Sequence, residues 1–177
     1  VQINHGIIGP DPSCPGPPNP RPMKTIKDSV HDYIEVDGVA LDLLDTAPLQ
    51  RLRHISQLGT VTLVYPSANH TRFEHSLGVY HLANRALGHL GIEGQQAERV
   101  RAAALLHDVG HGPYSHNVED LIYRHTGKYH DEVHDLIGEG EVARILSEHG
   151  LNPDRVADLV AGEGELGQLV SGELDVD

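Results

Sequence analysis

The sequence has few of the features that mark secreted or membrane proteins. A single cysteine, Cys14, occurs among 177 residues, which excludes an internal disulfide framework and fits a reducing, intracellular setting. No apolar run approaches the roughly 20 residues that cross a bilayer, and no secretory signal peptide is visible. We therefore expect a cytoplasmic protein without a membrane partner.

Basic residues are also scarce. The chain has 13 lysines and arginines against 26 acids, for a formal net charge of -13. This balance argues against strong nucleic-acid binding, which needs a basic face. Only three of the bases are lysines. Salt-adapted proteins and GC-rich genomes both produce such a composition, and the sequence leaves the two explanations open.

The length predicts one domain with its own core. Residues 1–22 are rich in proline and glycine and lack helical periodicity, which predicts a disordered leader or tag. Residues 23–177 then form the domain proper. Within them, residues 28–36 alternate loosely between apolar and polar and predict a short strand or extended arm.

Most of the remaining chain shows helical spacing of apolar residues, interrupted at glycines. Thr46 and Pro48 predict a helix start, and this helix is expected to run to Gly59 with Leu58 facing the core. Residues 60–65 predict an extended segment. Further helices are predicted over residues 39–44, 72–90, 96–108, 118–125, 131–137, 141–149, 153–160 and, more weakly, 166–174. The sequence thus predicts an all-α fold with a short extended N-terminal arm.

The 14 histidines gather at helix ends and in glycine-rich turns. The clearest group lies in residues 101–116, RAAALLHDVGHGPYSH, which begin as an apolar helix and break at Gly110. The segment then carries its imidazoles and one carboxylate: His107, Asp108, His111 and His116. Because packing gives no reason for an alanine-rich helix to end this way, we interpret the segment as the floor of a metal site.

A borderline divalent metal accepts imidazole nitrogen and carboxylate oxygen together. His107 and Asp108 are adjacent and would point about 100° apart on an ideal helix, so they can share a metal only where the helix unwinds. His75, early in the preceding long helix, is a third candidate. The sequence contains three other His-Asp pairs, and a lone pair is weak evidence, since His107 could instead cap helix carbonyls.

Five blocks of the sequence resemble the HD-domain phosphohydrolases, most closely the deoxynucleoside triphosphate triphosphohydrolase branch. They are LDTAPLQRLRHISQLG, YPSANHTRFEHSLGVYHLA, ALLHDVGHGPYSH, KYHDE and LDVD. The resemblance covers residues 27–177 and implies the HD-domain helical fold. It also implies that the domain is truncated at its C-terminal end, because the family's sugar- and phosphate-holding tyrosine and aspartate would follow the last block.

The resemblance further implies the roles of individual residues. It implies one catalytic metal, held by His75, His107, Asp108 and Asp177. It implies three catalytic histidines: His111, His116 and His130. Asp131 stands where the family usually has glutamate. Arg72 and Gln57 match residues that contact substrate phosphate and sugar. The metal is expected to be Mn, Fe, Co, Ni or Zn, and an additional Mg is left open.

Other interpretations of some of these residues stay open at this point. Arg72 could pair with Glu74 or Asp45 on the surface, and Asp175 competes with Asp177 for the last ligand position. A further group resembles an effector-binding block of some relatives, although a helix cap and packing contacts would explain it equally well: Asp45, Gln50, Arg51 and Arg53.

The function implied is hydrolysis of deoxynucleoside triphosphates to deoxynucleoside and triphosphate. A divalent metal lowers the pKa of water toward about 7, and histidines titrate nearest neutrality. By resemblance, His116 is favoured to protonate the leaving oxygen. Two alternatives remain, namely another HD-type nucleotide phosphodiesterase or phosphomonoesterase, and a non-catalytic nucleotide-binding regulatory module. The partner expected is a nucleotide, and a homo-oligomer is left open.

Overall fold

The computed structural model describes residues 22–114, 118–127, 133–172 and 175–177. The predicted leader, with Cys14, lies outside the described residues apart from residue 22, and so do His116, His130 and Asp131. The described chain is mostly helical and carries one two-stranded sheet. None of its described helices combines the length and apolarity that a bilayer crossing requires.

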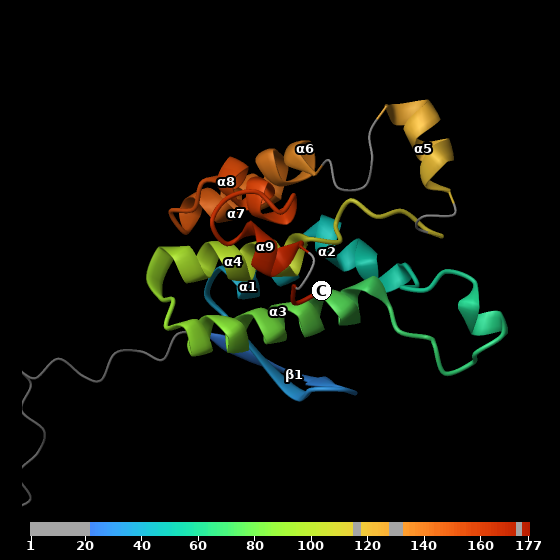
Figure 1. Ribbon diagram of the computed structural model, residues 1–177, viewed down its shortest axis with the longest axis horizontal. Coiled ribbons are helices and arrows are strands. Elements are labelled where there is room, and N and C mark those ends of the chain that lie inside the picture. The colour runs from blue at the N-terminus through green and yellow to red at the C-terminus, as the bar shows by residue number, and fades with distance from the viewer. Residues whose placement is uncertain (1–21, 115–117, 128–132, 173–174) are drawn as a thin grey trace, which may run out of the picture.

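The elements follow one another along the chain as a hairpin and then short helices around two longer ones (Figure 1). The strands are β1 (Met23–Asp28) and β2 (Asp32–Asp37). The α-helices are α1 (Gly38–Leu44), α2 (Ala47–Arg51), α3 (Arg72–Leu90), α4 (Gly94–Leu106), α5 (Glu119–Thr126), α6 (His134–Gly138), α7 (Gly140–Glu148), α8 (Pro153–Val160) and α9 (Gly167–Val170). Two 3-10 turns, η1 (Leu52–His54) and η2 (Val61–Leu63), lie between α2 and α3.

The predicted N-terminal arm is an antiparallel hairpin, so the fold is not strictly all-α. β1 pairs with β2 from Met23 opposite Asp37 to the turn at Asp28. The Asp28 carboxylate accepts hydrogen bonds from the backbone N–H groups of Val30 and His31, each at 2.8 Å, which closes the turn. Ile34 and Val36 on β2 are fully buried, so the hairpin is held by one apolar face.

Helix α4 forms the centre of the domain. Five consecutive residues, 102–106, have no exposed surface, and a helix that is apolar on all faces must be surrounded by other elements. In Figure 1, α3 lies on one side of α4, and α6, α7 and α8 lie on the other, while α9 overlaps α4 in this view and contacts both α4 and α8. Small alanine side chains allow this close approach, and the C-terminal end of α4 is thereby fixed inside the domain.

The segment between α2 and α3 differs from the prediction. The helix expected to reach Gly59 ends with η1, because Ile55 is extended and Ser56 forms an antiparallel bridge with Thr71. Leu58 is 45% exposed rather than buried. Residues 61–63, expected to be extended, form the 3-10 turn η2. Local apolar spacing therefore predicted one helix where a long-range bridge decides the backbone.

Candidate metal centre

The start of α3 is fixed by a capping box. The Thr71 hydroxyl accepts from the Glu74 N–H at 3.3 Å, and the Glu74 carboxylate accepts from the Thr71 N–H at 2.6 Å. This reciprocal pair satisfies free N–H groups of the first turn. It also fixes the orientation of that turn, which carries Arg72 and His75. The Thr-x-x-Glu pattern is visible in the sequence and agrees with the helix start that was predicted at residue 72.

The end of α4 carries His107 and Asp108 where the helix gives way to turns. His107 Nδ1 lies 2.8 Å from the carbonyl oxygen of Ala104, one turn back. Since a carbonyl only accepts, Nδ1 donates and Nε2 is left with its lone pair in the neutral ring. The capping role considered for His107 is therefore present, and it also aims Nε2 away from α4.

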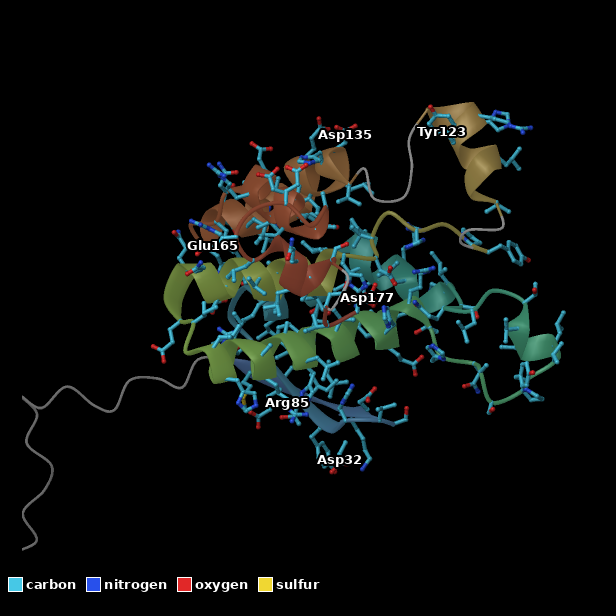
Figure 2. The ribbon with its side chains drawn as sticks, viewed as in Figure 1. Asp32, Arg85, Tyr123, Asp135, Glu165 and Asp177 are labelled. Atoms are coloured by element: carbon cyan, nitrogen blue, oxygen red, sulfur yellow. The ribbon has the colours of Figure 1, made fainter. Side chains whose placement is uncertain are left out.

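Imidazole and carboxylate atoms from three parts of the chain converge at this point. His107 Nε2 lies 3.2 Å from His75 Nε2. Asp177 Oδ1 lies 2.6 Å from His75 Nε2 and 3.6 Å from His107 Nε2. Asp108 Oδ1 lies 3.6 Å from His107 Nε2. Figure 2 shows Asp177 in the middle of the molecule, beside α3.

Asp177 is held in place by the backbone around it. The Val176 N–H donates to the Leu169 carbonyl at 3.1 Å, which ties the end of the chain to α9. The competing carboxylate, Asp175, instead accepts from the N–H groups of Gly172 and Asp177, at 2.7 and 3.2 Å. The structure thus places Asp177, and not Asp175, beside the two imidazoles.

Asp108 is the most enclosed group of the centre. Its Oδ2 accepts a hydrogen bond from Arg72 Nη1 at 2.8 Å, and its Oδ1 lies 3.3 Å from His111 Nε2. Arg72 and Asp108 are only 3% and 4% exposed. Arg72 therefore pairs with a buried carboxylate of the centre, and neither Glu74 nor Asp45 is its acidic partner in this ion pair. Its contact with substrate phosphate stays a prediction.

Gln57 lies beside the start of α3 because its N–H donates to the His70 carbonyl at 3.1 Å, next to the Ser56–Thr71 bridge. Its amide oxygen is buried and has no hydrogen-bond partner among the described residues. A buried amide oxygen without a partner is unfavourable, so Gln57 is a candidate for a hydrogen bond that this structure does not contain. Sugar contact by Gln57 remains a prediction.

The donor set fits a divalent cation. Two imidazole nitrogens and two carboxylate oxygens are ligand types that Mn, Fe, Co, Ni and Zn accept together. Three of the side chains, His75, His107 and Asp108, have ligand atoms within 4.8 Å of one another. The contacts of His107 with Ala104 and of Asp108 with Arg72 are the outer hydrogen bonds that orient ligands in metal sites.

The carboxylates shift the protonation of the centre. Burial lowers the pKa of His107, but the hydrogen bond with Asp177 and the charge of Asp108 outweigh it, and the pKa is raised overall. Hydrogen bonds from His107 and His75 hold the pKa of Asp177 well below its usual range. Asp177 is therefore ionised at neutral pH, while His107 binds a proton more readily than a free imidazole does.

We expect metal affinity to fall as the pH drops through the raised pKa of His107. Below that pKa, a cation must displace the proton from Nε2, so affinity should fall by about tenfold per pH unit. Asp177 does not contribute to this loss, because its lowered pKa keeps it ionised. Calorimetric titration with Mn²⁺ between about pH 8 and about pH 5 measures the slope. A flat profile would contradict a ligand role for His107.

Comparison with known proteins places this centre in a family. Residues 72–170, more than half of the chain, match the HD domain family. The chain belongs to the HD domain family. The match begins at Arg72 in α3, just before His75, and includes the His107-Asp108 pair at the end of α4. The resemblance inferred from the sequence blocks is thereby confirmed.

Three relatives show how far the likeness extends. An uncharacterized protein of Methanocaldococcus jannaschii is 36% identical over 159 residues, covering 88% of this HD-domain chain and 32% of its own. Human deoxynucleoside triphosphate triphosphohydrolase SAMHD1 is 38% identical over 148 residues, covering 75% of this chain and 24% of its own. The crystal structure of a phosphohydrolase from Bacteroides thetaiotaomicron superposes with a TM-score of 0.73 at 38% identity, covering 88% and 39% of the two chains. The chain therefore spans less than half the length of each of these proteins.

Proposed function

We propose that this HD domain is the catalytic core of a metal-dependent phosphohydrolase that splits deoxynucleoside triphosphates into deoxynucleoside and triphosphate. One observation carries the proposal: His75 of α3 and the His107-Asp108 pair after α4 have ligand atoms within 4.8 Å of one another, and Asp177 Oδ1 lies 2.6 Å from His75 Nε2 and 3.6 Å from His107 Nε2. A helical domain needs no such cluster for its stability, because buried carboxylates and imidazoles are unfavourable unless paired.

In this reaction, water adds to the α-phosphorus and the bond between that phosphorus and O5′ breaks. A bound divalent cation supplies Lewis acidity to the phosphate and makes water a better nucleophile near neutral pH. His111, whose Nε2 lies 3.3 Å from Asp108 Oδ1, is proposed by resemblance to donate a hydrogen bond to a phosphate oxygen. The departing O5′ needs a proton, which we assign by resemblance to His116, outside the described residues. His130, also outside them, is proposed as a further active-site histidine.

A cavity of about 420 Å³ opens beside the centre. It lies between the hairpin turn, the first half of α3 and the end of the chain, and its lining includes His75, Asp177, Asn69 and His70. This volume is of the size that takes a small organic ligand. Its acidic residues, Asp177 among them, disfavour phosphate, so we assign it to the nucleoside rather than to the triphosphate.

The choice of deoxynucleoside triphosphates rests on the activity for which the SAMHD1 relatives are named and on Gln57 and Arg72. The buried amide oxygen of Gln57 lacks a hydrogen-bond partner among the described residues, which supports the proposal that it accepts from a sugar hydroxyl when substrate binds. The identity of the native metal and the formation of homo-oligomers are further points of this proposal to be tested. Mn²⁺ is the first cation to test.

We expect the Mn²⁺-loaded chain to release tripolyphosphate and deoxynucleoside in equal amounts from at least one deoxynucleoside triphosphate. Ion chromatography of the anions and reversed-phase separation of the nucleosides measure both products. A sample stripped of metal by chelation is the control. Release of orthophosphate or pyrophosphate alone would contradict the triphosphohydrolase assignment and favour a different nucleotide phosphohydrolase. Metal-dependent nucleotide binding without turnover would favour a regulatory module.

A further inference from the structure

Arg51 joins α2 to the segment that carries Asp108 and His111. Its Nη2 donates to the carbonyl of Val109 at 2.9 Å and to the carbonyl of His111 at 2.8 Å. The two acceptors are 58 and 60 residues away along the chain, on either side of Gly110. The two hydrogens of this one nitrogen thus bind carbonyls on both sides of the turn that follows the His107-Asp108 pair.

The Val109 carbonyl needs a donor from elsewhere in the fold. A helical carbonyl accepts from the N–H four residues further on, and for Val109 that residue is Pro113, which has no N–H. Among the described residues, the backbone N–H groups of the turn make short-range bonds, from the Val109 N–H to the Leu106 carbonyl and from the His111 N–H to the Asp108 carbonyl. The guanidinium therefore supplies a donor for the Val109 carbonyl that no backbone N–H of the described turn provides.

The backbone of Arg51 is held in place by the residues around it. Leu49 and Leu52, on either side of it, are fully buried. The Gln50 side chain donates to the Leu44 carbonyl at 2.6 Å, which ties α2 back to α1. Desolvation lowers the pKa of Arg51, but a guanidinium stays charged at neutral pH. A charged donor on a fixed helix restrains the backbone that it binds.

We infer that Arg51 is a positioning residue for the metal centre. By binding the carbonyls of Val109 and His111, it holds the unwound turn in the shape that puts Asp108 Oδ1 beside His107 and His111. It acts through the backbone. This role is different from effector contact, the other possibility that the sequence raised for Arg51. Its effect on catalysis rests on the proposed function, whereas its effect on metal binding does not.

The test compares Arg51→Met, which removes the donors but keeps an unbranched stem, with Arg51→Lys, which keeps a cation on a shorter side chain. Arg144→Met is the matched control, because Arg144 is exposed on α7 and pairs only with Glu148 in the described contacts. We expect Arg51→Met to bind Co²⁺ roughly tenfold more weakly, as for other outer partners of metal ligands. Arg51→Lys should be intermediate and Arg144→Met unchanged. Calorimetry or Co²⁺ absorbance gives the dissociation constants.

A second readout needs no metal. Amide hydrogen exchange at Gly110 and His111 should be faster in metal-free Arg51→Met than in the unchanged chain, while exchange in α8 stays the same. If the unchanged chain turns over nucleotide, kcat should fall in Arg51→Met with little change in KM. Absence of turnover in every variant would remove the proposed function and leave the Co²⁺ comparison to decide the role of Arg51.

Co²⁺ affinity equal to that of the unchanged chain in a folded Arg51→Met variant would overturn the inference. If that variant does not fold, Arg51→Lys decides in the same way: weaker Co²⁺ binding at an unchanged melting temperature supports the positioning role, and unchanged binding overturns it.

Discussion

Asp108→Asn should lose metal binding and nucleotide hydrolysis together while keeping its fold. The amide can still accept from Arg72 Nη1, so the buried contact is retained in part. The negative charge that attracts a cation is gone, however. Replacing outer partners of ligands costs about 10- to 100-fold in metal affinity, and we expect at least the upper end of that range for a ligand itself.

Elemental analysis of the purified variant and a Mn²⁺ titration measure the first loss, and the tripolyphosphate assay measures the second. Asp135→Asn is the matched control, because Asp135 belongs to another His-Asp pair, on α6, and is exposed. It should behave like the unchanged chain. Retention of stoichiometric metal in Asp108→Asn would show that Asp108 is not a ligand.

Arg72→Met should destabilise the metal-free domain by about 3 to 5 kcal/mol, the range for removing one partner of a buried ion pair. Arg72 and Asp108 are both almost fully buried, and their side chains meet at 2.8 Å. Without the guanidinium, the Asp108 carboxylate must take up a proton or remain charged in a poorly solvated site. A cation that binds beside Asp108 compensates the charge, so the destabilisation should be smaller with saturating Mn²⁺.

Urea denaturation with and without Mn²⁺ gives the two free energies of unfolding. Arg144→Met is again the control, since it breaks an exposed pair between residues four apart on a helix, which contributes about 0.3 to 0.5 kcal/mol. An Arg72→Met variant as stable as this control would contradict the buried pair. A loss that is identical with and without Mn²⁺ would contradict a cation beside Asp108.

Much of the helical architecture follows from local sequence. The helix predicted over residues 72–90 has those bounds in the structure, and so does the one predicted over residues 153–160. The central helix was predicted two residues too late at its start and, in α4, ends at Leu106. These elements have caps, glycine stops and apolar spacing that act within a few residues, and such signals can be read without a tertiary structure.

The prediction was wrong where distant segments decide the backbone. Leu58 continues the apolar spacing of α2, but Ile55 is extended, Ser56 bridges to Thr71, and Leu58 lies in the turn that follows, at the surface. The N-terminal arm is extended as predicted, but its pairing with itself as a hairpin was not predicted. Hydrogen bonds between strands depend on which segments come together in the fold. The spacing of apolar residues along one segment does not identify its partner segment.

Sequence by itself determined the composition of the centre. It contained the imidazoles and carboxylates, placed His107 and Asp108 at a helix end, and provided a glycine and a proline to break the helix. Only the tertiary structure decided that Arg72 pairs with Asp108 and that Asp177 lies against His75 and His107. The reason is that residues can share a metal only if their ligand atoms have suitable distances and angles. These are set when the separate segments pack around α4.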